Sequence, residues 1–330
     1  MRYRGARARR LVAGMAIAAL MVPAAATAGS PDAADTCATA TPIAVGAVWT
    51  LEPLATTGDR DWFTFTLPAR TTAVVTLGNL QTDSTLQLQA ACGATIATSN
   101  RSGLQYEELV QTLPAGTYHV RVAAVGPGVG TRPYGIRVRT FSAQVVILSS
   151  SGWEPTTDRP RIAGEVLNLT RVAREDVKIK VSFYDAADHL IMSQATYARR
   201  ERFRPGQRSM FLWSDELVPG YDHYRLSVAA APISSYPPLT GLVVHPGGTT
   251  PDGFGGLTYF GTLQNTTTHL VGIPRVMVTI YDVWGQVWNA AFTDTAPDPM
   301  AAGATNDYEV YLADRTTGNR VTIVSHGYRN

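Results

Sequence analysis

Three aspartates near the start of the chain could hold a calcium ion together. Asp59 and Asp61 stand on either side of Arg60, and Asp83 follows further along. Calcium prefers several carboxylate and carbonyl oxygens as ligands. The same alternation also fits an aspartate-rich turn that leads into a strand, and we favour that turn because no complete ligand loop is visible. Calcium is the one cofactor that the sequence suggests.

A run of arginines is the sharpest charge feature. Residues 199–204 read Arg-Arg-Glu-Arg-Phe-Arg, and Arg208 follows. If the segment is extended, Arg200, Arg202 and Arg204 share one face, which could hold sulfate or phosphate groups of a cell-wall polymer. Residues 143–239 carry 12 basic and 11 acidic residues, so we favour a solvated edge strand that is guarded by its charges.

Two tryptophans are further candidates for ligand binding. Trp284 lies in a turn from Asp282 to Gly285, where a large ring is expected to be exposed, and Trp288 lies on the next strand. Exposed aromatic rings stack on sugars or anchor protein partners. Such tryptophans more often pack against their own domain or its neighbour, and we favour that interpretation.

Signatures of catalysis are mostly missing. The six histidines show neither the spacing of a helical zinc site nor a close pair on one strand. The sequence contains no Gly-x-Ser-x-Gly elbow and no phosphate-binding glycine loop. Distant residues could still meet in a triad, because geometry and not spacing defines one. We predict that the protein is not an enzyme.

Residues 1–28 have the three parts of a secretory signal peptide. Five arginines come first, an apolar run from Leu11 to Val22 follows, and small residues end the segment at Ala28. The run is too short to span a bilayer, so we expect cleavage and no membrane anchor. We therefore predict a protein that is secreted or associated with the cell surface.

The signal peptide also changes the charge argument. It contains five of the 28 basic residues and none of the 26 acidic ones, which leaves the mature chain at a formal charge of −3. The basic character of the whole chain therefore belongs mainly to the leader, and we expect no nucleic-acid partner.

Cys37 and Cys92 are the two cysteines of the chain. In an exported protein, an isolated pair within one domain is expected to form a disulfide. Closing a loop of this length would stabilise the fold by about 4 kcal/mol in the chain-entropy model. Two buried free thiols are the alternative.

Apolar residues recur mainly with period two, so helix should be scarce. From Val177 to Phe183, apolar residues alternate with Lys178, Lys180 and Ser182. In the later segment 276–281, valines and an isoleucine alternate with Met277, Thr279 and Tyr281. Both patterns predict a strand with one buried face and one face toward solvent. We predict an all-β protein with three β-sandwich domains.

Three motifs follow one another within residues 35–142, namely residues 59–65, Asp83 with Leu86 and Leu88, and residues 113–122. In these motifs and their order the segment resembles a bacterial pre-peptidase C-terminal (PPC) domain. The resemblance implies a compact, jelly-roll-like sandwich of a kind usually appended to secreted peptidases, with some members that bind calcium or matrix polymers. Here the segment comes first in the mature chain, and no peptidase domain accompanies it.

Residues 143–239 and 240–330 repeat each other without a gap at an offset of 97 positions. Gly164 matches Gly261, and Asn168 matches Asn265. Both copies resemble FxLYD domains, on residues 164–168 and 181–185 with Pro205-Gly206 in the first copy and on residues 261–265 and 278–282 in the second. The resemblance implies small immunoglobulin-like or fibronectin-like sandwiches and no catalytic role. Residues 245–256 are expected to form a mobile loop between the first two strands of the second copy.

Duplicated sandwiches are normally scaffolds or binding modules. We therefore predict an exported protein that acts in adhesion or in binding a ligand or partner, either an extracellular protein or a cell-wall polymer. An accessory or stabilising subunit for a separately encoded secreted hydrolase is one alternative. A polysaccharide-binding module is another, and it depends only on Trp284, Trp288 and the arginine run.

Overall fold

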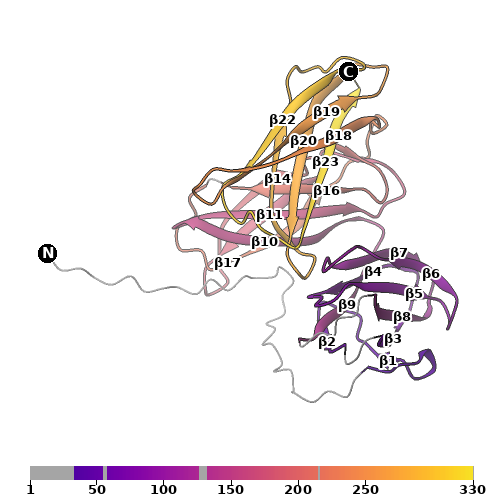
Figure 1. Ribbon diagram of the computed structural model, residues 1–330. Helices are drawn as coiled ribbons and strands as arrows, with labels where there is room; N and C mark the ends of the chain where they lie inside the picture. The colour runs from indigo at the N-terminus through magenta and orange to yellow at the C-terminus, as the bar shows by residue number, and fades with distance from the viewer. Residues whose placement is uncertain (1–32, 55–57, 126–131, 215, 330) are drawn as a thin grey trace.

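The computed structural model describes residues 33–54, 58–125, 132–214 and 216–329, and the predicted signal peptide lies outside this part of the chain. The described residues form strands and connecting turns, with one short 3-10 helix, η1 (Cys37–Thr39). None of the helical structure in this part is long and apolar enough to cross a membrane. The all-β prediction is confirmed, and the sheets form sandwich-like arrangements (Figure 1).

The N-terminal sandwich, residues 33–142, consists of two sheets. One contains, in order, β1 (Thr41–Pro42), β3 (Arg60–Leu67), β8 (Gly116–Ala124), β5 (Ser84–Gln89) and β6 (Thr95–Ser99). The other contains β2 (Thr50–Glu52), β9 (Tyr134–Phe141), β4 (Thr71–Gly78) and β7 (Glu107–Leu113). Alternate residues of β3, including Phe63 and Phe65, are buried in the core with Val75 and Leu77 of β4. This alternation is what a two-layer sandwich requires.

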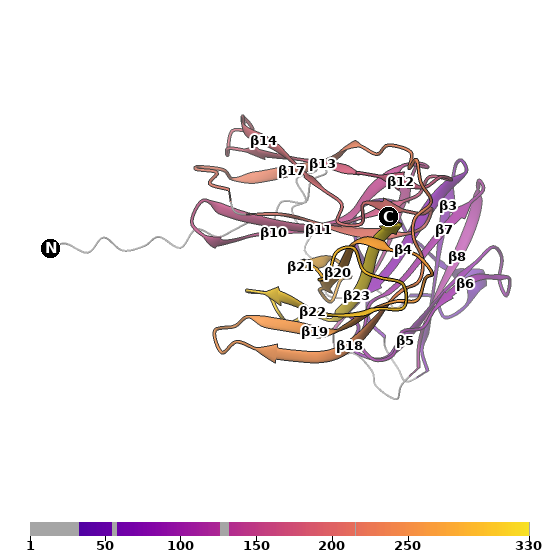
Figure 2. The ribbon, with the colours of Figure 1, turned by 90° about the horizontal axis from the view of Figure 1, so that it is seen from above.

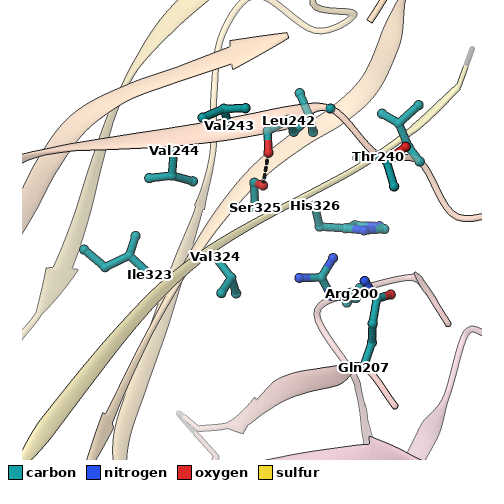
Figure 3. Close-up of a pocket in the computed structure, with 13 residues that line it drawn as sticks. Arg200, Gln207, Thr240, Leu242, Val243, Val244, Ile323, Val324, Ser325 and His326 are labelled. Atoms are coloured by element: carbon teal, nitrogen blue, oxygen red, sulfur yellow. Dashed lines mark hydrogen bonds between the residues drawn. The ribbon is translucent and has the colours of Figure 1, made fainter. Parts of the chain in front are cut away.

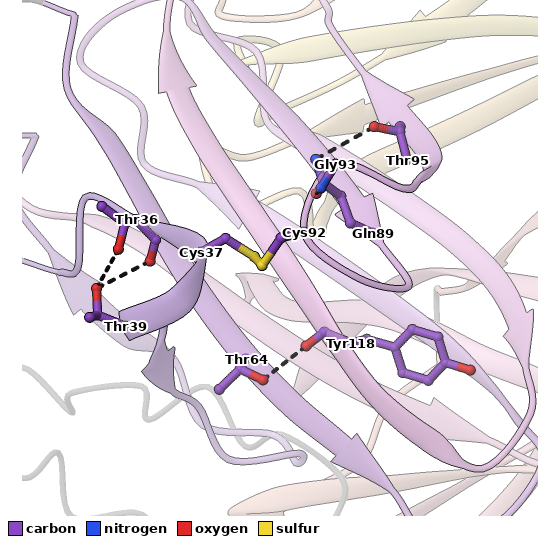
Figure 4. The surroundings of a disulfide bond; sticks show 9 residues. All are labelled: Thr36, Cys37, Thr39, Thr64, Gln89, Cys92, Gly93, Thr95 and Tyr118. Carbon is purple, nitrogen blue, oxygen red and sulfur yellow. Dashed lines mark hydrogen bonds between the residues drawn. A yellow bond between two sulfur atoms is a disulfide. The ribbon is translucent and has the colours of Figure 1, made fainter.

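The predicted disulfide is present in this sandwich. Cys37 of η1 is bonded to Cys92 in the turn between β5 and β6, over a sequence separation of 55 residues (Figure 4). It links the segment that precedes β1 to the far side of the same sheet, which β3 and β8 span. The short N-terminal segment is thereby attached to the sandwich.

The first repeat, residues 143–239, has an inner and an outer sheet. Inner sheet 1 contains β10 (Val145–Thr156), β11 (Arg159–Asn168) and β16 (Arg208–Trp213). Outer sheet 1 contains β14 (Leu190–Tyr197), β13 (Lys178–Tyr184) and β17 (His223–Ala230). A short ribbon of β12 (Arg174–Glu175) and β15 (Arg202–Phe203) lies beside them.

The second repeat, residues 240–330, has the same two sheets. Inner sheet 2 contains β21 (Val287–Asp294), β20 (Val271–Tyr281) and β23 (Arg320–Arg329). Outer sheet 2 contains β18 (Leu242–Pro251), β19 (Leu257–Asn265) and β22 (Thr305–Leu312). Strands β14, β16 and β17 each begin 97 positions before β21, β22 and β23. The sequence offset is therefore also a structural offset.

The shared asparagine has the same role in both repeats. The side-chain amide of Asn168 donates to the carbonyls of Val172 and Phe203, and its Oδ1 accepts from the backbone N–H and hydroxyl of Thr170. The second repeat has the same bonds at residues 97 positions later, namely Asn265, Thr267, His269 and Met300. Both asparagines are fully buried. Because buried polar atoms need hydrogen-bond partners, the side-chain amide bonds to backbone groups of two turns. Each asparagine thereby holds both turns against the end of its strand.

The shared glycine is explained by neighbouring atoms that leave no room for a side chain. A Cβ on Gly164 would lie 2.2 Å from the ring of Phe211, and one on Gly261 would lie 2.3 Å from the carbonyl oxygen of His245. In each repeat an aromatic residue of the neighbouring strand, Phe211 or Tyr308, occupies the space that the glycine leaves.

The two repeats stack as four layers. Seen from above, outer sheet 1, inner sheet 1, inner sheet 2 and outer sheet 2 follow one another (Figure 2). Separate hydrophobic cores fill the first and the second repeat. A third cluster joins the inner sheets and includes Trp153, Ala163 and Met210 of the first repeat with Met277 and Tyr281 of the second.

This packing corrects one prediction. Met277, Thr279 and Tyr281 were expected on a solvent face, yet their exposed fractions are 0%, 3% and 3%. They are covered because inner sheet 1 lies against them. In the first repeat the equivalent strand β13 leaves Lys180 exposed, whereas Ser182, which was predicted on the same solvent face, is buried.

The segment 245–256 also differs from the prediction. Instead of a loop, its first part continues β18 to Pro251, paired with β19 in a long hairpin. Asp252 closes the tip by accepting hydrogen bonds from the backbone N–H groups of Phe254 and Gly256. Phe254 at this tip is 97% exposed.

Candidate functional site

The three aspartates considered as calcium ligands do not form one group among the described residues. Asp61 is fully buried, and its Oδ2 accepts a hydrogen bond of 2.5 Å from the Tyr134 hydroxyl. Asp83 precedes β5, whereas Asp61 lies in β3, and β8 runs between these strands. Among the described residues, the one group of three potential metal-ligating side chains is Cys37, Cys92 and His119, and its two sulfurs form the disulfide. The described structure does not gather the predicted trio.

Trp284 packs between the N-terminal sandwich and the second repeat. Its ring centroid lies 4.9 Å from that of Trp49, and a Cβ on Gly135 would meet its ring at 2.5 Å. The backbone of the same turn accepts a hydrogen bond from Asn79 N through the carbonyl of Val283. Trp284 is only partly exposed. It contacts a neighbouring domain, as the favoured interpretation of the sequence had it.

Trp288 belongs to the contact between the repeats. The Arg315 guanidinium lies 4.1 Å from the Trp288 ring centroid and 4.8 Å from that of Trp153. The Trp288 carbonyl accepts a hydrogen bond from the Ser151 hydroxyl at 2.9 Å. Neither tryptophan stands on an open sheet face, so neither forms a flat platform for a sugar ring.

The arginine run does not form one strand. Only Arg202 lies in a strand, the two-residue β15, and its guanidinium is placed 4.8 Å from the Tyr236 ring and 5.2 Å from the Tyr328 ring. Arg204 donates to the carbonyl of Pro238 at 3.2 Å. Arg200 precedes β15 and is half-buried. The expected row of arginines on one exposed strand face is therefore absent from this segment.

Arg200 instead lines two adjoining cavities. The first, of about 480 Å³, lies between Arg200 and Gln207 on one side and strands β18 and β23 on the other. Figure 3 shows Arg200 beside His326 at this cavity, opposite Leu242 and Val243. The second cavity, of about 390 Å³, is lined by residues of all three domains. Arg200, Gln207 and Val324 line both, so the two cavities meet at these side chains.

The second cavity is rich in cations. Its charged lining residues are Arg101, Arg200, Arg208, Arg320, Glu108 and Glu165. Four arginines against two carboxylates give a net positive lining. A cavity with this balance attracts anions, because fixed charges of one sign in a partly enclosed site focus the field.

Arg208 joins the three domains beside this cavity. Its guanidinium pairs with Glu165 of the first repeat at 2.8 Å and with Glu108 of the N-terminal sandwich. Glu165 also accepts a hydrogen bond from the Tyr281 hydroxyl of the second repeat at 2.6 Å. Burial opposes the charge of Arg208, but Glu165 and Glu108 outweigh it and raise the pKa of Arg208 well above its ordinary value. Its charge is therefore already satisfied by the protein.

Arg200 differs from Arg208 in this respect. Burial, together with the charge of nearby Arg204, lowers the pKa of Arg200 to about 10. Its Nε donates to the carbonyl of Arg208 at 3.2 Å. Arg200 still carries its positive charge near neutral pH, and an anion in the cavity would offset the cost of burying it.

His326 lies beside Arg200 and is held neutral. Its Nε2 accepts a hydrogen bond of 3.0 Å from the backbone N–H of Glu201. Burial, followed by the charges of Arg200, Arg275 and Arg202, lowers the pKa of His326 well below its ordinary value. An accepting Nε2 and three nearby cations both favour the neutral ring. No sequence pattern singles out this histidine, because its partner Glu201 and its neighbour Arg200 come from another domain.

A family model described as the bacterial pre-peptidase C-terminal domain matches residues 59–124. The match covers strands β3 to β8 of the N-terminal sandwich and confirms the resemblance stated for that segment. The resemblance of the two repeats to FxLYD domains stays a prediction. No curated protein matches the chain.

Several solved structures show distant likeness to this chain. A GH2 β-galacturonidase from Eisenbergiella tayi has 9% identity and a TM-score of 0.33, over 64% of this chain and 34% of that one. A calcium-binding mutant of β-glucuronidase 2 from Bacteroides uniformis has 12% identity and a TM-score of 0.33, over 73% and 26%. The exo-chitosanase CsxA of Amycolatopsis orientalis has 15% identity and a TM-score of 0.32, over 70% and 30%. This chain spans about a third or less of each of those chains, and we draw no function from them.

Proposed function

We propose that this is an exported, non-catalytic protein that binds an anionic ligand outside the membrane at the cavities around Arg200. The ligand would be a sulfated or phosphorylated cell-wall polymer or an acidic segment of an extracellular protein. The observation that carries the proposal is the position of Arg200, which lines both cavities while the neighbouring Arg208 is paired with two carboxylates. Guanidinium groups suit this task because they donate two parallel hydrogen bonds to such anions.

Two features support a binding role. The first cavity lies between the two repeats and the second where all three domains meet, and boundaries between domains are common locations of binding sites. The match to the PPC family is compatible with an extracellular binding module.

The test is a binding screen with the mature chain, residues 29–330. Probes are a sulfated polysaccharide, a poly(glycerol phosphate) and purified cell walls, each with and without calcium. We expect saturable binding to at least one anionic probe, and Arg200→Gln should weaken it by about tenfold, the cost of one charge-assisted hydrogen bond. Arg70→Gln is the matched control because Arg70 is exposed and lies in the N-terminal sandwich far from the cavities in sequence and in strand order. Equal weakening by both variants would contradict a specific site.

The family match favours a second candidate function. PPC domains usually accompany secreted peptidases, so the protein would then be an accessory or stabilising subunit for a separately encoded hydrolase. Immobilised mature chain would retain one such hydrolase from the native secretome. Calcium dependence stays a prediction that the same experiment tests.

A further inference from the structure

The contact between the two repeats uses sheets that are not equivalent. Inner sheet 1 (β10, β11 and β16) corresponds by the 97-residue offset to outer sheet 2 (β18, β19 and β22). Inner sheet 2 corresponds in the same way to outer sheet 1. The repeats therefore meet head to tail, and each leaves uncovered the face that its relative uses for the contact (Figure 2).

On outer sheet 1, a lysine replaces an apolar residue of the contact. Lys180 occupies the position of Met277, and each pairs with the equivalent residue of the adjacent strand, Ala195 or Phe292. Lys178 occupies the position of Arg275. The chain contains only two lysines, and both lie on this strand. The face also carries Tyr184 and Tyr197, which are at least partly exposed.

Other ionisable groups on outer sheet 1 form their own pairs at its end. Arg225 makes two hydrogen bonds to Asp188, and His223 contacts Asp188 and Asp222. His189 pairs with Asp185 in the turn between β13 and β14. With the histidines neutral, this end holds one arginine against three aspartates and is net negative, so the positive charge of the face is confined to the part of β13 around its two lysines.

On outer sheet 2, acidic residues replace the apolar residues of the contact. Asp307 occupies the position of Met210, and Glu309 occupies that of Leu212, both of which belong to the buried cluster between the inner sheets. Asp307 and Glu309 are exposed. Beside them, Phe260 and Tyr311 are 37% and 52% exposed. This face thus combines negative charge with aromatic rings.

We propose that the chain associates with further copies of itself, with outer sheet 1 of one molecule on outer sheet 2 of the next. The lysines in the middle of outer sheet 1 are opposite in charge to Asp307 and Glu309 of outer sheet 2, and the two faces repeat the geometry of a contact that the molecule already makes internally. Where methionines meet at the internal contact, a lysine and an aspartate meet at the external one. In a head-to-tail contact, each added molecule still has one of the two faces free. The contact can therefore repeat and form an open chain of molecules. The proposal is independent of the Arg200 cavities.

The first test is sedimentation velocity over a range of protein concentrations. At about 20 mM salt the weight-average sedimentation coefficient should rise with concentration, and at about 500 mM salt the rise should largely vanish, because salt screens exposed charges. Lys180→Glu or Asp307→Lys should each weaken association at low salt by about tenfold or more, since like charges then face each other. Arg70→Glu makes the same change of charge outside both faces and should leave association unchanged.

Mixing the variants separates this contact from general charge effects. Lys180→Glu retains a normal outer sheet 2, and Asp307→Lys retains a normal outer sheet 1, so the two together should associate although neither does alone. A monomeric wild-type protein at all concentrations and low salt would overturn the proposal. So would a mixture that stays monomeric.

A carbodiimide, which joins an amine to a carboxylate as an amide with loss of water, gives an independent readout. Lys180 and Asp307 lie on opposite outer layers of one molecule, with both inner sheets between them (Figure 2). A cross-link from Lys178 or Lys180 to Asp307 or Glu309 must therefore join two molecules. We expect this cross-link in the dimer band, and cross-links to other acids alone would contradict the assignment.

Discussion

Strand β13 of the first repeat and strand β20 of the second have equivalent places and opposite surroundings. β13 presents Lys180 to solvent, whereas β20 presents Met277 to the buried contact between the repeats. The asparagine at the end of the adjacent strand, in contrast, has the same hydrogen-bond partners in both repeats. After duplication, residues that close the fold stayed the same, and residues on the sheet faces changed with what covers them.

The largest expected effect comes from removing Arg208, which forms ion pairs with Glu108 and Glu165. Arg208→Ala leaves Glu108 and Glu165 buried without their cation, and the side chains of these acids are 5% and 6% exposed. Removing one partner of such a group costs about 3–5 kcal/mol. Chemical denaturation should show this loss. The equivalent change in the second repeat, Thr305→Ala, alters an exposed residue and should change stability by less than about 0.5 kcal/mol.

The shared glycine allows a sharper comparison of the two copies. Gly261→Ala would place a methyl group against two backbone atoms, His245 O at 2.3 Å and Gly247 N at 2.7 Å. Gly164→Ala would meet the ring of Phe211 at 2.2 Å, a side chain that can move, and only one backbone atom, Ser149 O, at 2.9 Å. We expect a loss of about 3 kcal/mol at Gly261 and a smaller one at Gly164, in line with the cost of overpacking. Equal losses in thermal unfolding would contradict this reasoning.

His326 makes stability depend on pH in the second repeat, where the first repeat has Ala229 at the equivalent position. The pKa of His326 is lowered in the folded protein, so the unfolded chain binds the proton more readily. Stability is therefore full above the unfolded pKa of about 6.5 and falls as pH drops below it, by at most about 1.4 kcal/mol per pH unit. The free energy of unfolding, measured by chemical denaturation across this pH range, should depend less on pH for His326→Gln than for the wild type. His245→Gln alters an exposed histidine and is the control.

The smallest effect is expected at the hairpin tip. Phe254→Thr introduces the residue that the first repeat has at this position, Thr157. Because the Phe254 ring is 97% exposed, the change removes almost no buried area, and stability should stay within about 0.5 kcal/mol. A larger loss in thermal unfolding would show that the ring is covered in solution.

The sequence was sufficient for the elements within each repeat. Period-two alternation located the strands, and the offset of 97 positions located their counterparts. The sequence was less informative about which strand faces are buried and what covers them. In β20, Met277 and Tyr281 continue an apolar run that is typical of a strand buried on both sides, but the run does not say which sheet covers the second face.

The candidate site could be predicted only in part. Arg200 was selected from its charge, and it does line both cavities. The pairing of Arg208 with Glu108 could not be foreseen, because the two residues are 100 positions apart and belong to different domains. Trp284 was identified as a ring in an exposed turn, and only the position of Trp49 in the N-terminal sandwich explains where it packs.

The cluster shared by the three domains has a consequence for how this chain can change by recombination. Tyr106, Met210 and Tyr281 come one from each domain and are buried in the same cluster. If one domain were deleted or exchanged for a relative, the other two would be left with uncovered apolar surface and uncompensated carboxylates. Loss of any one module should therefore destabilise the other two, because each covers part of the cluster that they share.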